Sequence, residues 1–556
     1  MAEKENFDIF CTKNMRSSMQ RGEPLRLSAE RTVTEALVAL IDHQGDGAAL
    51  EYYGESWTRQ ELVDTAARVA RSLADLGIQP GDRVSVLAHN VPEQLLVFLA
   101  LARLGAIHAP INPQWLADEA NYLLRDNGAR ALFCTWDTFE TARAAVDATA
   151  VEHLVVIPRS LEGTAGCPAD AADYPNFQDL VGTESLSDDL GAPDAPLCLW
   201  YTSGTTGRPK GAVWTHRGFL ENTFGWVQAF GMSDVAIGVA AAPIAHNGLA
   251  IGVMVPVMSG GRAHLLRRVD PTEMIETILG ERVTFMASVP AIMSILSIRA
   301  AQLGVDALPS LKVLAIGAAP TPKEQLMELG VFLPNCGIFH SYGASEGHFA
   351  TCPPAALPGK LGSVGRPLPG RSIQIVDEDW APVESGTTGR IAVKGAGTMT
   401  RYWARDDATE SVMRGGWMAI GDLGYLDDDG FLWVSGRDKD VIISGGFNVY
   451  ASEVENVIAS DPRVETVAVL GEADDVLGER VVAYLAPREG QLLTADIIAA
   501  ICEQRLAKYK RPRSIHVVEA LPVNSLGKVQ KHLIDRIAEG GDADGDEHVV
   551  ERKNSP

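Results

Sequence analysis

Short apolar runs alternate with helical segments in the N-terminal half of the chain, and this alternation restricts the fold more than any other feature. The runs 82–88 and 106–111 flank a helical pattern over 92–104, and further apolar runs follow at 130–134 and 153–157. Neighbouring parallel strands need a crossover connection, which is usually a helix. The rhythm therefore predicts α/β structure, with parallel sheets covered by helices.

The pattern changes toward the C-terminus. From about residue 371, the runs 373–376, 390–393 and 431–434 are typical of antiparallel hairpins. The last hundred residues predict helices near 452–460 and 495–506 and strands near 466–470, 481–485 and 514–518. We therefore expect a large N-terminal domain over 1–437, a small C-terminal α+β domain over 438–539, and an acidic, disordered tail over 540–556.

Composition excludes several classes of protein. The 556 residues are 46% hydrophobic and 22% charged, which is ordinary for a globular chain, and the formal net charge of −24 without a basic stripe argues against a nucleic-acid partner. The most apolar run, 248–259, is too short to span a bilayer, and the N-terminus lacks a signal core. Seven scattered cysteines without a C-x-x-C pair favour a reducing cytoplasm and argue against structural zinc. The oligomeric state stays open, with a homodimer as one option.

The stretch WYTSGTTGRPKG, residues 200–211, has the composition of a phosphate-binding loop. It differs from the loop of nucleotide hydrolases, because Gly204 and Gly207 are too close and Lys210 is followed by Gly211 instead of a metal-binding hydroxyl. The flanking runs predict a strand on each side, where the hydrolase loop would continue into a helix. A glycine-rich turn without a ligand is the alternative interpretation.

Four other segments accompany this loop: SYGASEG at 341–347, GWMAIGDLG at 416–424, SGRDKDVIISGGFNV at 435–449 and PVNSLGK at 522–528. In this order and spacing, the five motifs resemble the adenylate-forming (ANL) superfamily, which includes the AMP-dependent acyl-CoA synthetases. The resemblance covers about residues 30–535. It implies a large domain of two stacked α/β lobes plus a β-rich part, followed by a small mobile domain.

The resemblance also implies a reaction. A carboxylate attacks the α-phosphate of ATP with Mg²⁺ bound, pyrophosphate leaves, and the acyl-adenylate passes to the thiol of coenzyme A. Two anions must meet, so such a site has to supply cations and amide donors rather than a nucleophile. The leading hypothesis is an acyl-CoA synthetase for a medium-chain or aryl acid. The alternatives are transfer to a carrier-protein thiol or an amine, and a catalytically silent nucleotide- or acyl-binding regulator.

By resemblance, each motif has a role in binding ATP. Glu346 would hold Mg²⁺, and Ser345, where the family more often has threonine, would contact phosphate. The residues implied to bind the phosphates are Thr202, Ser203, Gly204, Thr205, Thr206, Gly207 and Lys210, with Thr205 and Lys210 also taking part in catalysis. The residues implied to bind adenosine are Gly317, Ala318, Ala319, Tyr342, Gly343, Asp422 and Arg437, the last two at the ribose.

The remaining implied roles belong to the small domain. Lys528 would bridge the carboxylate and the α-phosphate, and Lys439 would be the hinge about which this domain rotates. Gly445 and Gly446 would then let the backbone approach the thiol-bearing arm of coenzyme A. Several CoA ligases of the superfamily carry lysine where this chain has Gly445, so no side chain is assigned to the thiol step.

The acid pocket is predicted from the segments on either side of the Glu346 motif. By resemblance it is bordered by Ala245, His246, Asn247 and His348. Each histidine could instead be a structural residue with its hydrogen bonds satisfied. Small walls with a few polar side chains suit either a medium acyl chain or a substituted aromatic acid, and the sequence leaves this choice open.

Overall fold

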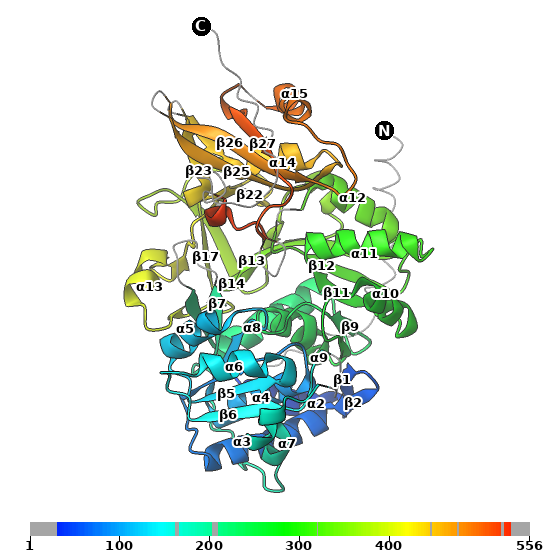
Figure 1. The fold of residues 1–556 in the computed structure, drawn as a ribbon, viewed down its shortest axis with the longest axis vertical. Coiled ribbons are helices and arrows are strands. Elements are labelled where there is room, and N and C mark those ends of the chain that lie inside the picture. Colours follow the sequence, from blue (N-terminus) through cyan, green and yellow to red (C-terminus); the bar gives the residue numbers. More distant parts are fainter. Residues whose placement is uncertain are drawn as a thin grey trace.

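The computed structural model describes residues 30–161, 166–202, 209–319, 321–444, 447–474, 477–506, 508–523 and 528–534. These residues form four sheets; in Figure 1 the blue and cyan N-terminal strands lie at the bottom and the orange strands of the C-terminal domain lie at the top. The predicted acidic tail, 540–556, lies outside the described residues. None of the described helices has the length and apolarity needed to cross a bilayer.

The first lobe is built on a seven-stranded sheet of order β18-β8-β7-β4-β3-β5-β6. Its strands are β3 (Arg83–Leu87), β4 (Ile107–Ile111), β5 (Ala131–Thr135), β6 (His153–Ile157), β7 (Pro196–Thr202), β8 (Lys210–Thr215) and β18 (Arg401–Tyr402). The pairs β3–β4, β3–β5 and β5–β6 are parallel, which confirms the prediction for this region. The accompanying helices are α3 (Arg59–Asp75), α4 (Pro92–Leu104), α5 (Ala117–Asn127), α6 (Phe139–Ala145), α7 (Phe177–Leu180) and α8 (His216–Phe230).

The second lobe is a nine-stranded sheet of order β15-β14-β13-β12-β11-β9-β10-β1-β2. Its strands are β1 (Ala48–Tyr52), β2 (Glu55–Thr58), β9 (Ile237–Ala240), β10 (Arg262–Leu265), β11 (Phe285–Ser288), β12 (Val313–Ile316), β13 (Gly337–Ala344), β14 (Gly347–Cys352) and β15 (Arg366–Pro367). Its helices are η3 (Leu249–Met254), α9 (Val255–Met258), α10 (Pro271–Gly280), α11 (Pro290–Gln302) and α12 (Lys323–Phe332), whereas α2 (Val33–Gln44) packs against α3, α4 and α8. Strands β9 to β13 are parallel, whereas β13 and β14 form an antiparallel hairpin.

The two remaining sheets are mainly antiparallel, as predicted for the region after residue 371. The six-stranded one contains β16 (Arg371–Val376), β17 (Gly389–Gly395), β19 (Met413–Arg414), β20 (Trp417–Met418), β21 (Asp422–Leu426) and β22 (Leu432–Arg437), and α13 (Asp406–Val412) lies beside it. The C-terminal sheet contains β23 (Val441–Ser444), β24 (Phe447–Tyr450), β25 (Val464–Asp474), β26 (Gly478–Pro487) and β27 (Ser514–Val517), with α14 (Ala451–Ala459) and α15 (Ala495–Arg505). The chain passes from one to the other between residues 437 and 441, where the domain boundary is predicted.

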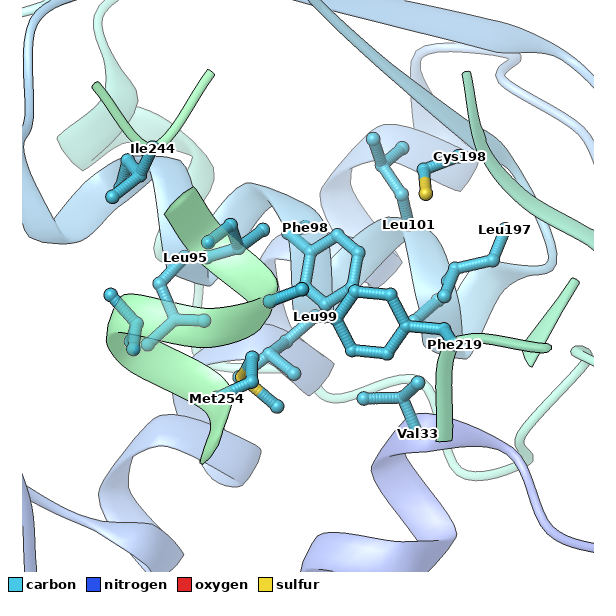
Figure 2. Close-up of a cluster of buried hydrophobic side chains, with 14 of the residues drawn as sticks. Val33, Leu95, Phe98, Leu99, Leu101, Leu197, Cys198, Phe219, Ile244 and Met254 are labelled. Carbon is cyan, nitrogen blue, oxygen red and sulfur yellow. The ribbon is translucent and has the colours of Figure 1, made fainter. Parts of the chain in front are cut away.

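A buried cluster joins the two α/β lobes. Figure 2 shows Phe98 of α4 against Phe219 of α8, with their ring centroids 5.3 Å apart, and Met254 of η3 nearby. Helix α4 is apolar around its circumference and almost all of its residues are buried, as expected for a helix inside a large core. Because residues of both lobes contribute to this cluster, the lobes share one core.

Candidate active site

The phosphate-loop motif stands between two paired strands. Strands β7 and β8 are antiparallel, and Thr202 pairs with Lys210 at the end of the ladder, which confirms the predicted strand–loop–strand arrangement. The Lys210 ammonium lies over the ring of Tyr402, 5.1 Å from its centroid. The predicted phosphate-binding residues Ser203, Gly204, Thr205, Thr206 and Gly207 lie outside the described residues.

Glu346 occupies the turn between β13 and β14 and is only 7% exposed. The Tyr402 hydroxyl donates a hydrogen bond to its Oε1 at 2.6 Å, and the Trp214 indole N–H donates to the carbonyl of Ser345 at 2.9 Å. Burial raises the pKa of Glu346, while the hydrogen bond from Tyr402 opposes this shift. Tyr402 thus contacts both the Glu346 carboxylate, through its hydroxyl, and the Lys210 ammonium, through its ring.

The described residues contain no group of three or more acidic, histidine or cysteine side chains that could bind a metal ion through protein ligands alone. Mg²⁺ commonly binds through one or two carboxylates together with phosphate oxygens of the substrate. A lone Glu346 fits this mode, with ATP supplying the remaining ligands. The metal role of Glu346 stays a prediction.

The raised pKa of Glu346 should make the binding of Mg²⁺–ATP depend on pH. A proton competes with Mg²⁺ for the carboxylate, so we expect affinity to fall with decreasing pH, starting above the usual range for a glutamate. Tyr402→Phe removes a donor that favours the ionised form, so it should move this loss to higher pH. Calorimetric titrations from neutral to mildly acidic pH would measure both curves.

The control for this titration is Glu346→Gln, which cannot ionise. It should bind Mg²⁺–ATP weakly and without this pH dependence. If Glu346→Gln keeps the parental pH dependence, another group holds the metal.

The predicted adenosine residues converge from three strands. The Tyr342 hydroxyl of β13 donates to Oδ2 of Asp422 at 2.5 Å, and Nε of Arg437 lies 3.1 Å from the other carboxylate oxygen. Asp422 and Arg437 are directly paired in the β21–β22 ladder. Burial, followed by the negative charge of Asp422, raises the pKa of Tyr342 well above its usual value. The structure therefore brings together three residues that are up to 95 positions apart in sequence.

The segment after β12 passes close to β13 in an unusual backbone conformation. A Cβ at Gly317 would lie 2.4 Å from the carbonyl oxygen of Ser341, so only glycine fits there. Ala318 has φ +64°, in the left-handed region that costs energy for a residue with a side chain. Gly343 sits beside a β-bulge and is crowded by His348. Such strain is concentrated at ligand-binding sites, which agrees with the predicted adenine contact.

Lys528 of the small domain reaches the same cluster. The residue is exposed to solvent, but nearby protein groups displace part of the hydration of its ammonium and lower its pKa. Repulsion from Arg437 acts in the same direction, whereas Asp422 and Asp440 oppose it. Lys439, the predicted hinge, lies in the short helix η5 (Asp438–Asp440) between β22 and β23. The predicted thiol-step residues Gly445 and Gly446 lie outside the described residues.

The proposed acid-binding residues 245–247 form a turn before the π-helix η3, an element that is frequent at functional sites. Burial lowers the pKa of His246 to about 4, so its ring is neutral at neutral pH. The Asn247 amide donates to the carbonyl of Ala344 at 2.9 Å, which ties this turn to the Glu346 hairpin. Its Oδ1 is buried and has no partner among the described residues.

Sequence reasoning missed Asn90, which fixes the start of this turn. Asn90 is 2% exposed, and its amide donates to the carbonyls of Ala241, Ala242 and Leu266. Its Oδ1 accepts a hydrogen bond from the Ile244 N–H at 2.9 Å. An asparagine between a strand and a helix is common, so nothing local pointed to these contacts more than 150 positions away.

His348 lies on β14 and is buried against α8. Its Nδ1 is 3.0 Å from Nδ2 and 3.2 Å from Oδ1 of Asn222, and burial lowers its pKa to about 3. Because Nδ1 is bound to Asn222, Nε2 is the ring nitrogen that could contact the acid.

Comparison with known proteins decides the family. The model of the AMP-binding enzyme family matches residues 38–403, and that of the AMP-binding enzyme C-terminal domain matches residues 453–528. The chain belongs to the AMP-binding enzyme family. Together, the two matches begin in α2 and end at Lys528, and they include three of the five sequence motifs, those at 200–211, 341–347 and 522–528; the motifs at 416–424 and 435–449 lie between the two matches.

Several relatives are CoA ligases of different acids. An indoleacetate–CoA ligase of Aromatoleum aromaticum is 33% identical over 85% of this chain and 91% of the relative. A feruloyl-CoA synthase of an Amycolatopsis species is 33% identical over 88% and 95%. A 2-succinylbenzoate–CoA ligase of Geobacillus kaustophilus is 33% identical over 86% and 93%. These relatives confirm the predicted enzyme class, an AMP-forming acid–thiol ligase.

Solved structures confirm the fold class. ATP-bound MatB from Rhodopseudomonas palustris superimposes with a TM-score of 0.79 and 28% identity, over 91% of this chain and 99% of the other. The o-succinylbenzoate CoA synthetase of Bacillus subtilis, in complex with ATP and a magnesium ion, gives a TM-score of 0.78 and 29% identity over 90% and 99%. ATP, Mg²⁺ and coenzyme A are accordingly the cofactors and co-substrates of this class. The roles of individual residues stay predictions.

Proposed function

We propose that this enzyme activates an aromatic acid with a polar substituent and transfers it to coenzyme A. The observation that carries the choice of acid is the buried Oδ1 of Asn247, which has no hydrogen-bond partner among the described residues and lies in the turn bound to the Glu346 hairpin. An aliphatic chain would leave this acceptor unpaired, at a cost of about 1–3 kcal/mol. A hydroxyl, amine or indole N–H on the acid would satisfy it. Names of relatives that act on indoleacetate and ferulate support the same choice.

The first step needs positive charge where two anions meet. An oxygen of the acid attacks the α-phosphorus, and the bond from this phosphorus to the bridging oxygen of pyrophosphate breaks. Lys528 would reduce the repulsion between carboxylate and α-phosphate, while Lys210 and a Mg²⁺ held at Glu346 would stabilise the leaving pyrophosphate. Asp422, fixed by Tyr342 and Arg437, would orient the ribose.

The second step needs the small domain to turn. The sulfur of coenzyme A attacks the acyl carbon, and AMP leaves with the electron pair of the broken carbon–oxygen bond. Rotation near Lys439 would withdraw Lys528 and present the backbone at 445–446 to the thiol-bearing arm. We place the domain boundary at this short segment, and we infer a cytoplasmic location from the unpaired cysteines.

A panel of acids tests the proposal. Each acid is incubated with Mg²⁺–ATP, and pyrophosphate is measured with and without coenzyme A, with Glu346→Gln as the inactive control. We expect turnover with aromatic acids that carry a hydroxyl or amine, and thioester only when coenzyme A is present. Preference for unsubstituted medium-chain acids would overturn the choice of acid. Pyrophosphate release with amines but not coenzyme A would indicate an amide-forming enzyme.

Enlarging Ala245 should narrow the range of acids. This side chain is 2% exposed beside His246, so phenylalanine would occupy space at the wall of the proposed acid pocket. Overpacking of a close-fitting wall costs about 1–3 kcal/mol, which is about 5- to 150-fold in selectivity against the larger acid. The measurement is the ratio of kcat/KM for a large and a small acid in Ala245→Val and Ala245→Phe.

The KM for ATP is the internal control of this series. It should change little, because Ala245 is predicted to border the acid and not the nucleotide. Equal losses for both acids, or a large rise in the KM for ATP, would mean that Ala245 does not border the acid.

A further inference from the structure

The buried guanidinium of Arg371 forms no ion pair with a carboxylate among the described residues, although the charge of Glu221 is near enough to oppose the lowering of its pKa. Arg371 is 8% exposed and donates to the carbonyls of Pro369 at 2.9 Å and Gly397 at 3.2 Å, and to Oδ1 of Asn222 at 2.8 Å. These acceptors are neutral, and burial lowers the pKa of Arg371 to about 10. Burying such a charge without a carboxylate costs free energy. Arg371 therefore matters through the side chain that it orients.

Arg371 fixes the orientation of Asn222. A guanidinium can only donate hydrogen bonds, so the side-chain oxygen of Asn222 must face it. Asn222 is 1% exposed in α8, and its amide nitrogen is therefore turned toward Nδ1 of His348 at 3.0 Å.

The orientation of Asn222 in turn selects the tautomer of His348. With Nδ1 as acceptor, the amide N–H of Asn222 has a partner; with a proton on Nδ1, two donors would face each other at 3.0 Å. The alternative bond from Nδ1 to Oδ1 is longer, at 3.2 Å, and would leave the buried amide nitrogen unsatisfied. A doubly protonated ring is disfavoured for the same reason, because its Nδ1 proton would also face the amide N–H of Asn222. Its proton therefore lies on Nε2.

The His348 ring also lies against the hairpin that carries the predicted nucleotide residues. It follows Glu346 by two residues, and its Cδ2 edge is so close to Gly343 that a Cβ there would be 2.8 Å away. Its other neighbour is Trp226 of α8, in an edge-to-face contact with centroids 5.5 Å apart. The ring thus stands between α8 and the hairpin that carries Tyr342 and Glu346.

We propose that Arg371 and Asn222 are positioning residues that fix His348 as a hydrogen-bond donor, through Nε2, to an acceptor oxygen on the acid. The enzyme would then prefer acids that carry a carbonyl, carboxylate or ether oxygen away from the reacting carboxylate. This inference rests on the proposed function. Asn247 would recognise a hydrogen-bond donor on the acid, and His348 would in addition recognise an acceptor on it.

Matched acids of equal shape test the preference. The pair is para-acetylbenzoate and para-isopropylbenzoate, which differ by a carbonyl oxygen in place of a methyl group. We expect the parent enzyme to favour the acetyl acid, and His348→Phe to reduce the ratio of kcat/KM by about 5- to 150-fold, because a buried polar partner is lost. Asn222→Leu should reduce the same ratio, since it frees the tautomer while keeping His348.

The control is His340→Phe in the same sheet, which removes another buried imidazole, the one bound to the carbonyl of Ser363. It should leave the ratio of the two acids unchanged. The value of kcat/KM for para-carboxybenzoate, compared with that for para-acetylbenzoate, shows whether the site prefers an anionic or a neutral acceptor.

The tautomer itself is read in the parent enzyme by nitrogen-15 NMR of labelled histidine, with the resonance assigned by its absence in His348→Phe. We expect a proton on Nε2 and none on Nδ1. A proton on Nδ1, or equal ratios in parent and His348→Phe, would overturn the assignment. If the isopropyl acid is activated and the acetyl-to-isopropyl ratio of kcat/KM is the same in the parent and in His348→Phe, only this inference is contradicted. If no aromatic acid is activated, the proposed function is contradicted as well.

Discussion

Replacing Lys528 with alanine should slow adenylate formation by about 10²–10³-fold, the scale of removing one preorganised electrostatic donor. The ammonium lies in the field of Asp422, Arg437 and Asp440, and its charge is useful only while the acid and the α-phosphate approach each other. Transfer of a supplied acyl-adenylate to coenzyme A should stay near the parental rate. Single-turnover assays of the two half-reactions measure these rates separately.

Lys531→Ala is the matched control, because this lysine belongs to the same segment and pairs with Glu455 at 2.8 Å. It should affect neither half-reaction by more than a small factor. Equal losses of both half-reactions in Lys528→Ala would refute the bridging role.

Lys439→Pro should have the opposite effect and block thioester formation. Proline fixes φ near −65°, which suits the short helix η5 but prevents the backbone change that a rotation requires. Adenylate should still form, whereas its transfer should fall by at least about 10²-fold, since misplaced groups react poorly. The measurement is accumulation of acyl-adenylate and thioester in the presence of coenzyme A.

Lys439→Ala separates the backbone from the side chain. Alanine keeps φ free, so this variant should form thioester far better than the proline variant. Parental thioester rates in Lys439→Pro would place the hinge elsewhere or show that rotation is unnecessary.

Local signals predicted the elements of the fold closely. The helix expected over 92–104 is α4 (Pro92–Leu104), because proline at its first position and the left-handed Gly105 after it set both ends. The strand expected near 466–470 is longer, β25 (Val464–Asp474). Its outer residues alternate in burial and pair with β26, so their extended form depends on the partner strand and not on a local apolar run.

The candidate site was predictable only in part. Its sequence motifs identify the residues of the site but not the residues that hydrogen-bond to them. Glu346, Asp422 and Lys528 stand in recognisable segments. By contrast, Tyr402 and Asn90 act through contacts that bridge 56 and 154 positions. Such pairs follow from how the sheets pack, so no pattern within a short window of sequence could have indicated them.

The hairpin β13–β14 limits how this enzyme can acquire a new substrate. It carries Tyr342 and Glu346, which we propose bind ATP and Mg²⁺, and also His348, which we propose contacts the acid. Substitutions in this hairpin should therefore affect the binding of both substrates. Helix α8 meets His348 from the other side, through Asn222 and Trp226, and none of the contacts described for it involves the predicted nucleotide residues. In directed evolution toward other acids, we therefore expect tolerated substitutions to appear mainly in α8, while the β13–β14 hairpin stays nearly unchanged.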